Sequence, residues 1–250
     1  MAPSTGTLSI QPLFPLALGQ VVLAPDLLET ARQLAAIQAL RGEATSNPDP
    51  GCAWTGDLNG VWQLHHHPVF AALIDELCGH AWAYLRGLGF NPAGLALHIQ
   101  RCWPVVSEAG QVVGRHHHPN AHLSAVYYLN GDGSGRSGCL RIWPHRPPNE
   151  LVRGLAVGHG GPIDPTHPLN AAWIDVAPRA GLLLLFPAST DHAVLQNEDE
   201  QDSRFSLSID FLLTAPLAGP GESPPEYLAP HPAQWQNVAV GHAVGEDGVA

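Results

Sequence analysis

The chain has 250 residues, 45% of them hydrophobic, which is enough to build the core of one large domain. Its formal net charge of −11 argues against a nucleic-acid backbone or an anionic membrane as partner, because both are bound through clustered cations. All 11 basic residues are arginine, and the lack of lysine excludes a Walker-type phosphate loop, a Schiff-base lysine and a lysine general base.

Two helical patterns lie in the first ninety residues. Residues 1–24 predict an irregular or short-strand beginning. Pro25 and Asp26 then open a helix whose apolar residues recur at helical spacing up to Gly42. A second such pattern begins at Pro68 and is broken by glycines after about twenty residues. We expect both helices to form a layer over one face of a sheet.

The stretch between the helices, residues 43–60, is rich in Gly, Pro and Asn and predicts a loop. A histidine triplet, His65–His67, follows it directly before Pro68. Loop or helix-cap duty is the easier interpretation of that triplet, because proline favours the first turn of a helix.

Beyond residue 93 the sequence changes to short runs rich in Val, Ile, Leu, Tyr and Trp, separated by Gly and Pro. This texture is typical of a many-stranded β structure. About eight strands fit a double-layered jelly roll, which holds a ligand between its two sheets. The expected strands are 95–103, 112–118, 122–129, 138–143, 172–176, 181–186, 191–196 and 204–213.

Two proline-rich segments complete the predicted domain organisation. Residues 144–171 are too many for a simple turn and predict a lid or binding loop, or else a mobile insertion. Residues 215–250 predict an extended wrap or a disordered tail. We therefore expect a single domain over residues 1–214, with a helical layer at 25–90 and a β core at 94–213.

A GxGxxG match runs from Gly133 to Gly138, but a strand pattern follows it instead of a helix. It therefore predicts a hairpin loop and not a dinucleotide site. There is no GxSxG elbow, so serine hydrolysis lacks its usual marker.

The histidines around residue 117 predict a metal site. In a strand, alternate side chains share one side, so His116 and His118 can converge while His117 faces away. Two neutral imidazoles at that spacing suit iron or zinc. His192, where an apolar strand opens into a turn, is the best candidate for a third ligand. The alternative is that these are surface histidines.

Arg204 lies inside a strand whose neighbours are apolar. If its side chain points into the barrel, the buried guanidinium requires an anionic partner, and a carboxylate held by two parallel hydrogen bonds is the natural one. Ser206 would point the same way and could add a hydroxyl. The alternative is a strand arginine that pairs with Asp199, Glu200 or Asp202.

At this point the chain resembles the iron(II)- and 2-oxoglutarate-dependent oxygenases, specifically the prolyl-hydroxylase-like branch and its bacterial relatives. The resemblance covers roughly residues 95–213. It is carried by four motifs in the family's order, Tyr127-Tyr-Leu-Asn130, Ser137-Gly-Cys-Leu-Arg-Ile-Trp-Pro144, Leu185-Phe-Pro-Ala-Ser-Thr-Asp-His192 and Arg204-Phe-Ser206.

The resemblance implies a fold, a reaction and roles for residues. The fold is mainly β, a double-stranded β-helix with the N-terminal helices packed on one sheet. His116 and His192 would bind iron, Arg204 would pair with the distal carboxylate of 2-oxoglutarate, and Tyr128 would hydrogen-bond the same cosubstrate. Iron(II) and 2-oxoglutarate are thus the implied cofactors, with ascorbate as an accessory reductant, and the enzyme would be a dioxygenase that releases succinate and CO2.

The first metal motif departs from the family pattern. The family has His-x-Asp, whereas the matching residues here are His116-His117-His118. The shifted match His118-Pro-Asn120 offers only a neutral amide, so the usual facial triad of two histidines and one carboxylate is not visible. We expect His118 to replace the carboxylate, with His122 in reserve. If the position is empty instead, a halide could occupy it, as in halogenating members of the family.

The substrate is expected to be a small molecule or an amino-acid or peptide side chain, with O2 as the second reactant. Trp143, Arg141 and the 144–171 segment are the candidates for the substrate side, because they follow the strands nearest the presumed metal site; a core tryptophan and an exposed arginine are the plainer interpretation.

Two other functions stay open. One is a three-histidine, cupin-like dioxygenase that uses metal and oxygen without 2-oxoglutarate. The other is a non-enzymatic jelly roll that binds a metal or a sugar.

The four cysteines are scattered without a CxxC motif, and there is no signal-peptide pattern. No apolar run approaches the roughly 20 residues that span a bilayer. The expectation is therefore a soluble protein in the cytoplasm. The sequence gives no indication of the oligomeric state.

Overall fold

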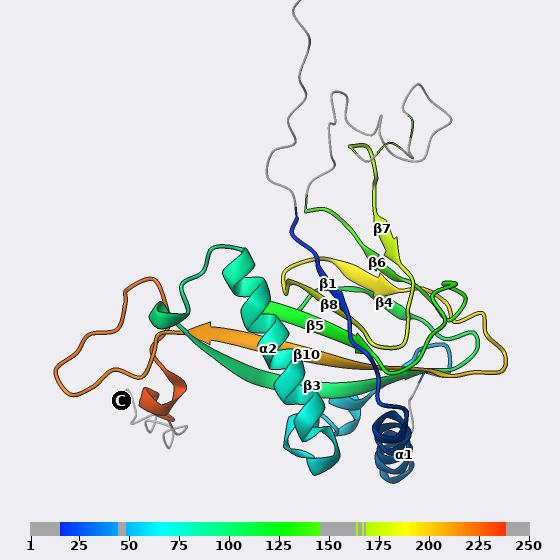
Figure 1. Ribbon diagram of the computed structural model, residues 1–250, viewed down its shortest axis with the longest axis horizontal. Coiled ribbons are helices and arrows are strands. Elements are labelled where there is room, and N and C mark those ends of the chain that lie inside the picture. Colours follow the sequence, from blue (N-terminus) through cyan, green and yellow to red (C-terminus); the bar gives the residue numbers. More distant parts are fainter. Residues whose placement is uncertain (1–15, 45–48, 146–163, 165–166, 168, 239–250) are drawn as a thin grey trace, which may run out of the picture.

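The computed structural model describes residues 16–44, 49–145, 164, 167 and 169–238 (Figure 1). The strands in chain order are β1 (Gly19–Val22), β2 (Trp54–Thr55), β3 (Ala96–Ser107), β4 (Val113–His116), β5 (Leu123–Tyr128), β6 (Leu140–Ile142), β7 (Ile174–Val176), β8 (Leu182–Pro187), β9 (His192–Val194) and β10 (Arg204–Thr214). The α-helices are α1 (Leu27–Glu43) and α2 (Ala71–Gly87). Single-turn 3-10 helices are η1 (Gly56–Asn59), η2 (Leu64–His66), η3 (Pro68–Phe70), η4 (Pro92–Gly94) and η5 (Pro232–Gln234).

Helix α1 begins where the sequence predicts, and α2 begins three residues after the predicted start. Asp26 caps α1, because its carboxylate accepts the backbone N–H groups of Leu28 and Glu29 at 2.9 and 3.1 Å. The turn that leads into α2 starts at Pro68, and the ring of His67 accepts the N–H of Val69 at 3.3 Å. The cap role expected for the triplet His65–His67 is therefore present at His67.

The strands form two antiparallel sheets. The larger has the order β1-β8-β5-β10-β3-β2 and the smaller the order β4-β9-β6-β7, and every pairing between these strands is antiparallel. Four strands of each sheet, the eight that the sequence predicts, form the two layers of a double-stranded β-helix. The expected fold class is confirmed.

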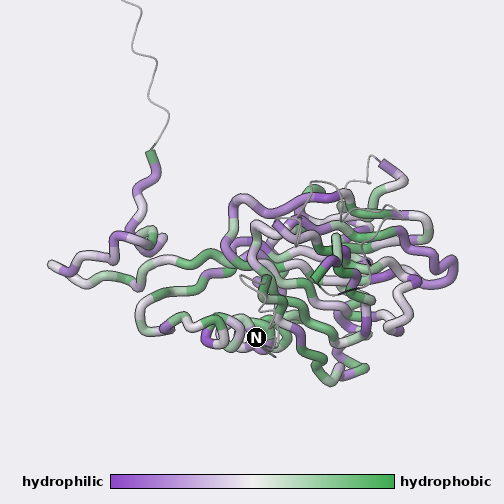
Figure 2. Tube along the Cα trace, turned by 90° about the horizontal axis from the view of Figure 1, so that it is seen from above, coloured by the Kyte–Doolittle hydropathy of each residue, from purple (hydrophilic) through white to green (hydrophobic). Residues whose placement is uncertain are grey.

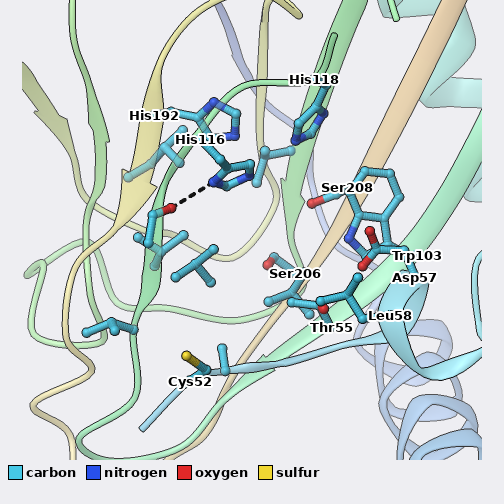
Figure 3. A pocket seen from close by; sticks show the side chains of 18 of the residues that line it. Cys52, Thr55, Asp57, Leu58, Trp103, His116, His118, His192, Ser206 and Ser208 are labelled. Atoms are coloured by element: carbon cyan, nitrogen blue, oxygen red, sulfur yellow. Dashed lines mark hydrogen bonds between the residues drawn. The ribbon is translucent and has the colours of Figure 1, made fainter. Parts of the chain in front are cut away.

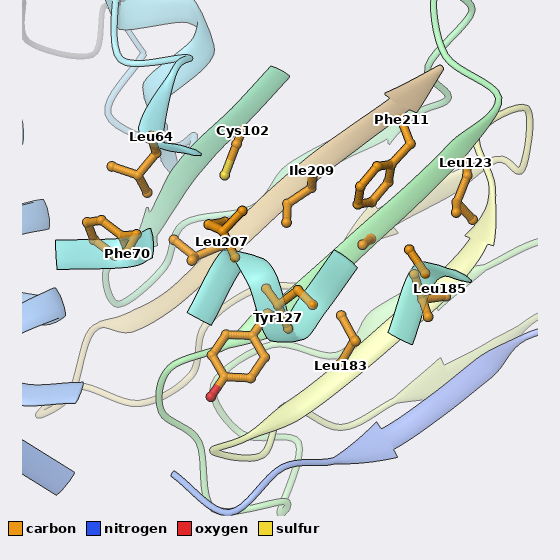
Figure 4. Close-up of a cluster of buried hydrophobic side chains, with 14 of the residues drawn as sticks. Leu64, Phe70, Cys102, Leu123, Tyr127, Leu183, Leu185, Leu207, Ile209 and Phe211 are labelled. Atoms are coloured by element: carbon orange, nitrogen blue, oxygen red, sulfur yellow. The ribbon is translucent and has the colours of Figure 1, made fainter. Parts of the chain in front are cut away.

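The outer face of the larger sheet carries the main hydrophobic core. Odd-numbered residues of β10, such as Leu207, Ile209 and Phe211, pack there against α2 residues such as Leu77 and Leu85. Figure 4 shows this layer of side chains between the strands and α2, and in Figure 1 both helices lie on the same side of the sheet. The predicted helical layer over one sheet face is therefore present.

The inner face of the same strands points toward the smaller sheet. Val126 and Tyr128 of β5 and alternate residues of β8 form a second buried cluster with Leu140 and Ile142 of β6. Since successive side chains of a strand point to opposite faces, each strand contributes to both clusters. The tube in Figure 2 shows apolar stretches running through the interior and polar ones mainly along the peripheral loops. The space between the sheets is where the site lies.

Two local expectations are wrong. The loop predicted for residues 43–60 contains strand β2, which pairs with β3, and the turn η1, although residues 45–48 lie outside the described residues. The segment from Gly133 to Gly138 is a loop but not a hairpin, because β5 pairs with β8 and β10 whereas β6 pairs with β7 and β9. This loop carries the chain from one sheet to the other.

Some predicted segments lie largely beyond the described residues. This is so for residues 1–15, for most of the 144–171 segment, and for the end of the chain from residue 239. In residues 215–238 the one regular element is η5, and Ala215 bonds through its N–H to the carbonyl of Ala229. The division into a domain ending at residue 214 and a tail stays a prediction. Within the described part of the chain, no helix combines the length and apolarity needed to cross a bilayer.

The core between the larger sheet and α2 should dominate stability. Leu207 is fully buried in it, so Leu207→Ala is expected to lower the free energy of unfolding by about 2–5 kcal/mol through lost burial and a residual cavity. The matched variant Leu217→Ala, at a side chain that is 60% exposed, should change it by less than about 0.5 kcal/mol. Urea denaturation of both variants measures the difference, and equal effects would contradict the packing described.

Candidate active site

Three histidines from two chain segments meet between the sheets. His116 at the end of β4 lies directly opposite His192 at the start of β9, and His118 follows two residues after β4. The ring centroids are 4.3 Å apart for His116 and His192, 5.1 Å for His118 and His192, and 5.2 Å for His116 and His118. One nitrogen from each ring lies within 4.8 Å of the others. The three candidates named from the sequence therefore form one cluster (Figure 3).

The Nδ1 atom of each ring already has a hydrogen-bond partner. His116 Nδ1 lies 2.8 Å from the carbonyl of Gly114, and His192 Nδ1 lies 2.8 Å from the carbonyl of Thr190. His118 Nδ1 lies 2.5 Å from Oδ1 of Asp210. Since these acceptors hold the proton on Nδ1, the lone pair of each neutral ring is on Nε2. This leaves three nitrogen donors for a metal ion.

Burial favours the neutral form of His116 and His192. It lowers the pKa of His192 to about 3, and the neighbouring His116 adds to the effect. Burial also lowers the pKa of His116. Neutral imidazoles are the form that binds iron or zinc, so the cluster has the chemistry of a metal site.

The other nearby histidines have different roles. His117 turns away, as expected, and its Nδ1 lies 3.2 Å from the Asp191 carboxylate. His122, the expected reserve ligand, uses its Nδ1 to accept the N–H of Leu213 at 3.0 Å. It is not part of the cluster, whose third member is His118.

Asp210 is a site residue that sequence reasoning missed. It is completely buried on β10. Besides His118, its Oδ1 accepts the hydroxyl of Ser124 at 3.0 Å, and its Oδ2 accepts Nη2 of Arg101 at 2.6 Å. Burial alone would raise the pKa of Asp210, but hydrogen bonds and charges from His118 and Arg101 outweigh it and lower the pKa. Alternation along β10 from Arg204 was the signal that could have found it, since residues 204 and 210 share a face.

Arg204 points into the barrel, as one of the two sequence interpretations requires. The residue is 1% exposed, and its Nη1 donates to the carbonyls of Ser137 and Gly138 at 3.1 and 2.9 Å. Its Nε and Nη2 are buried without a hydrogen-bond partner, and among the described residues no carboxylate forms an ion pair with it. Burial lowers the pKa of this guanidinium, since an uncompensated charge is costly there. The arrangement requires an anion.

Gly138 is needed at the point where the chain passes Arg204. Its φ of +90° lies in the left-handed region, and a Cβ there would approach the carbonyl oxygen of Leu195 to 2.3 Å and Nη1 of Arg204 to 3.1 Å. The glycine thus lets the backbone approach closely and offer its carbonyl to the guanidinium.

Tyr128 and Ser206 stand beside Arg204. They are directly opposite each other in the β5–β10 pairing, and both line the same cavity as Arg204. The hydroxyl of Tyr128 is buried without a partner, and burial raises its pKa to about 12, so it stays a hydrogen-bond donor. The guanidinium and the phenol therefore hold unused donors in one buried place, which suits a carboxylate.

A single cavity of about 610 Å³ contains both groups. Arg204, Tyr128 and Ser206 line one part of it and the histidine cluster another. The wall across from the histidines is formed by Thr55, Asp57, Leu58 and Trp103 (Figure 3). The cavity thus joins an anion-binding end, a metal-binding group and a largely apolar wall.

Comparison with known families gives one match, which lies in this core. Residues 101–210, which include the three histidines and Arg204, match the family model described as "Putative 2OG-Fe(II) oxygenase", where 2OG is 2-oxoglutarate. Over these residues the β core is similar to the 2OG-Fe(II) oxygenase family. Iron(II) and 2-oxoglutarate, the two groups that this description names, are the cofactors that the match indicates. The unused donors of Arg204 and Tyr128 and the three available Nε2 atoms fit a dicarboxylate and a metal ion.

Several solved structures share the fold. The α-ketoglutarate-dependent carbocyclase SnoK from nogalamycin biosynthesis superposes with a TM-score of 0.55 at 15% identity, covering 80% of this chain and 82% of its own. A prolyl-4-hydroxylase from Pseudomonas putida gives 0.51 at 20% identity, with 79% and 92% covered. AviO1 from Streptomyces viridochromogenes gives 0.51 at 16%, with 82% and 93% covered. No curated protein sequence matches the chain.

The residues expected on the substrate side of the oxygenase do not line the cavity. Arg141 points outward from β6, forms two hydrogen bonds of 2.7 Å with Asp175 and stacks on Trp173. Trp143 lies under the guanidinium of Arg115 at 4.5 Å and is not part of the cavity wall. Strand alternation explains the error, because Leu140 and Ile142 take the inward positions of β6.

Removal of the Arg204 charge should abolish tight cosubstrate binding. Arg204→Met is expected to weaken 2-oxoglutarate binding by about 2 kcal/mol or more, roughly 30-fold, because a buried charge pair is lost. Isothermal titration of the Mn(II)-loaded protein measures it, and Mn(II) binding itself should be unchanged. Arg136→Met, at an exposed arginine, is the matched control. Equal 2-oxoglutarate affinity in the two variants would contradict the assignment.

Proposed function

We propose that this oxygenase hydroxylates a C–H bond of a small molecule. In the balanced reaction, 2-oxoglutarate, O2 and the substrate give succinate, CO2 and the alcohol. One oxygen atom enters the new carboxylate of succinate and the other enters the substrate.

The observation that carries the proposal is a group of three unused donors on two buried side chains of the cavity. Arg204 and Tyr128 bring Nε, Nη2 and a phenolic hydroxyl to one place, with no protein acceptor for any of them. A carboxylate satisfies all three and neutralises the guanidinium. In this proposal Arg204 binds the distal carboxylate of 2-oxoglutarate through both free nitrogens, and Tyr128 and Ser206 donate hydrogen bonds to the same cosubstrate.

His116, His118 and His192 are the proposed metal ligands through Nε2. The iron, when bound, supplies the activation of O2 and the oxidative decarboxylation of 2-oxoglutarate. The chain's own part is to hold the three rings in fixed orientations through their Nδ1 partners. Leu140, Val126 and Val194 line the cavity near the rings and help to exclude water from them.

The third ligand position bears on the type of reaction. A halogenating relative needs that position free for a halide, but here the His118 ring is turned toward the other two and lies within the ligand group. With His118 as the third ligand no position is left for a halide, and we therefore favour hydroxylation over halogenation.

The cavity wall opposite the histidines favours a substrate with an apolar part. Trp103, Leu58 and Val113 line it, and a total of about 610 Å³ lies within the range of small-molecule sites. Asp57 and Asn120 add polar groups to the cavity lining. A compact molecule with an apolar face and a few polar groups fits this wall better than an extended peptide.

Two alternative functions do not explain the burial of Arg204. A cupin-like dioxygenase that uses no 2-oxoglutarate, or a jelly roll that only binds a metal or sugar, has no use for a buried guanidinium with free donors. Arg204 is turned into the barrel, where these alternatives leave its charge uncompensated. We therefore favour the 2-oxoglutarate-dependent reaction.

Turnover of 2-oxoglutarate tests the function directly. With iron(II), ascorbate and O2, the wild type should release succinate even without substrate, slowly and uncoupled, whereas His192→Ala should lose at least about 100-fold through loss of a metal ligand. His80→Ala, on α2 and away from the cavity, should behave as wild type. Succinate is measured by NMR or by a coupled enzyme assay.

The same assay can refute the proposal. Succinate release that is equal in the wild type and in His192→Ala, or absent from an iron-loaded wild type across a panel of small-molecule substrates, would remove the assignment.

A further inference from the structure

We propose that Asp210 is a positioning residue of the metal centre. It holds the ring of His118 in place, and it supplies from behind that ring the negative charge that a ligand set of three neutral imidazoles lacks. This inference rests on the proposed function, because it takes the histidine cluster to be the iron site.

The strand register brings the partners of Asp210 together. In the larger sheet, Asp210 lies directly opposite Ser124 of β5 on one side and Arg101 of β3 on the other. Both carboxylate oxygens are occupied by fixed donors, with distances of 2.5 Å to His118 Nδ1, 3.0 Å to Ser124 Oγ and 2.6 Å to Arg101 Nη2. A β-bulge follows at residues 210 and 211. The side chain is therefore held in place from three directions.

His118 differs from the other two ligands in the charge of its support. The Nδ1 atoms of His116 and His192 bond to neutral backbone carbonyls, whereas that of His118 bonds to a carboxylate. A carboxylate behind an imidazole fixes the ring and makes its Nε2 a stronger donor, and its loss typically costs 10–100-fold in metal affinity. His118 stands where the usual facial triad has its own carboxylate ligand. Compared with the usual triad, the negative charge thus lies further from the metal, with one imidazole ring in between.

Arg101 balances this buried charge without cancelling its contact with His118. Its guanidinium bonds to Oδ2, the oxygen that His118 does not use, stacks on Trp103 at 4.8 Å and reaches Asp57 at 3.4 Å. Because Arg101 keeps Asp57 and partial solvent access when Asp210 is neutralised, the variant Asp210→Asn leaves no fully buried unpaired cation. The variant is therefore suited to a test.

The test is metal binding, which does not depend on turnover. Co(II) titrated into the metal-free protein is followed by calorimetry and by its visible absorption spectrum. Asp210→Asn should bind Co(II) about 10–100-fold more weakly than wild type, with an altered spectrum. Asp175→Asn is the matched control, because it breaks an Asp–Arg pair on the outer face of the smaller sheet, and its Co(II) affinity and spectrum should be those of wild type.

A charge-relocation pair separates an electrostatic role from a merely structural one. In His118→Asp a carboxylate at the ligand position adjoins Asp210, and the two like charges should weaken Co(II) binding. In the double variant His118→Asp, Asp210→Asn, one carboxylate remains, now at the metal, and Co(II) should bind at least about 10-fold more tightly than in the single variant. A double variant no better than the single one would overturn the proposal.

The outcomes distinguish this proposal from the function on which it rests. A wild type that binds no divalent metal overturns the proposed function itself. A wild type that binds Co(II) together with an Asp210→Asn protein of equal affinity and spectrum overturns only the role of Asp210. If circular dichroism shows Asp210→Asn to be unfolded, Arg101→Gln replaces it: an unchanged Co(II) affinity there overturns the proposal, and a tighter one, from a less balanced Asp210 charge, supports it.

Discussion

The register of β10 between β5 and β3 is the constraint on which the site depends. Pairing on both edges fixes which residues of β10 face inward, and these are Arg204, Ser206, Ser208 and Asp210. At about 3.4 Å per residue, the six steps along the strand from Arg204 to Asp210 span roughly 20 Å. One strand therefore carries both the anchor for the cosubstrate and the support for a metal ligand. A slip of one residue would exchange them for the apolar side chains that pack under α2.

The two faces of β10 have different roles, because the outer face stabilises the fold and the inner face forms the site. The outer face buries Leu207, Ile209 and Phe211 against the helices, which makes the register costly to change. That rigidity permits the inner face to hold groups that are unfavourable by themselves, notably a buried guanidinium with unused donors and a buried carboxylate. Charges are placed in pairs along the cavity, so that Asp210 has Arg101 and His118, while Arg204 is left for a ligand.

Sequence patterns predicted the parts of this arrangement that depend on local periodicity. Two-residue spacing placed His116 and His118 on one side of the chain, and the polar Arg204 within an apolar strand indicated an inward guanidinium. The patterns failed for residues whose role is decided by contacts between strands that are distant in the sequence. The sequence alone shows Asp210 as a single acidic residue in a strand. Its role depends on partners that lie on β3, on β5 and beyond β4, far away in the chain. Arg141 and Trp143, expected on the substrate side, do not line the cavity, since a three-residue strand such as β6 shows no periodicity from which to infer its inward side.

The central claim is that three imidazoles and no carboxylate bind the iron. X-ray absorption of the iron(II)-loaded wild type under anaerobic conditions measures this most directly, because imidazole ligands give characteristic outer-shell scattering that carboxylates lack. The account predicts three imidazoles per iron, with the remaining ligands supplied by 2-oxoglutarate and water. A spectrum that requires two imidazoles and a protein carboxylate would contradict it.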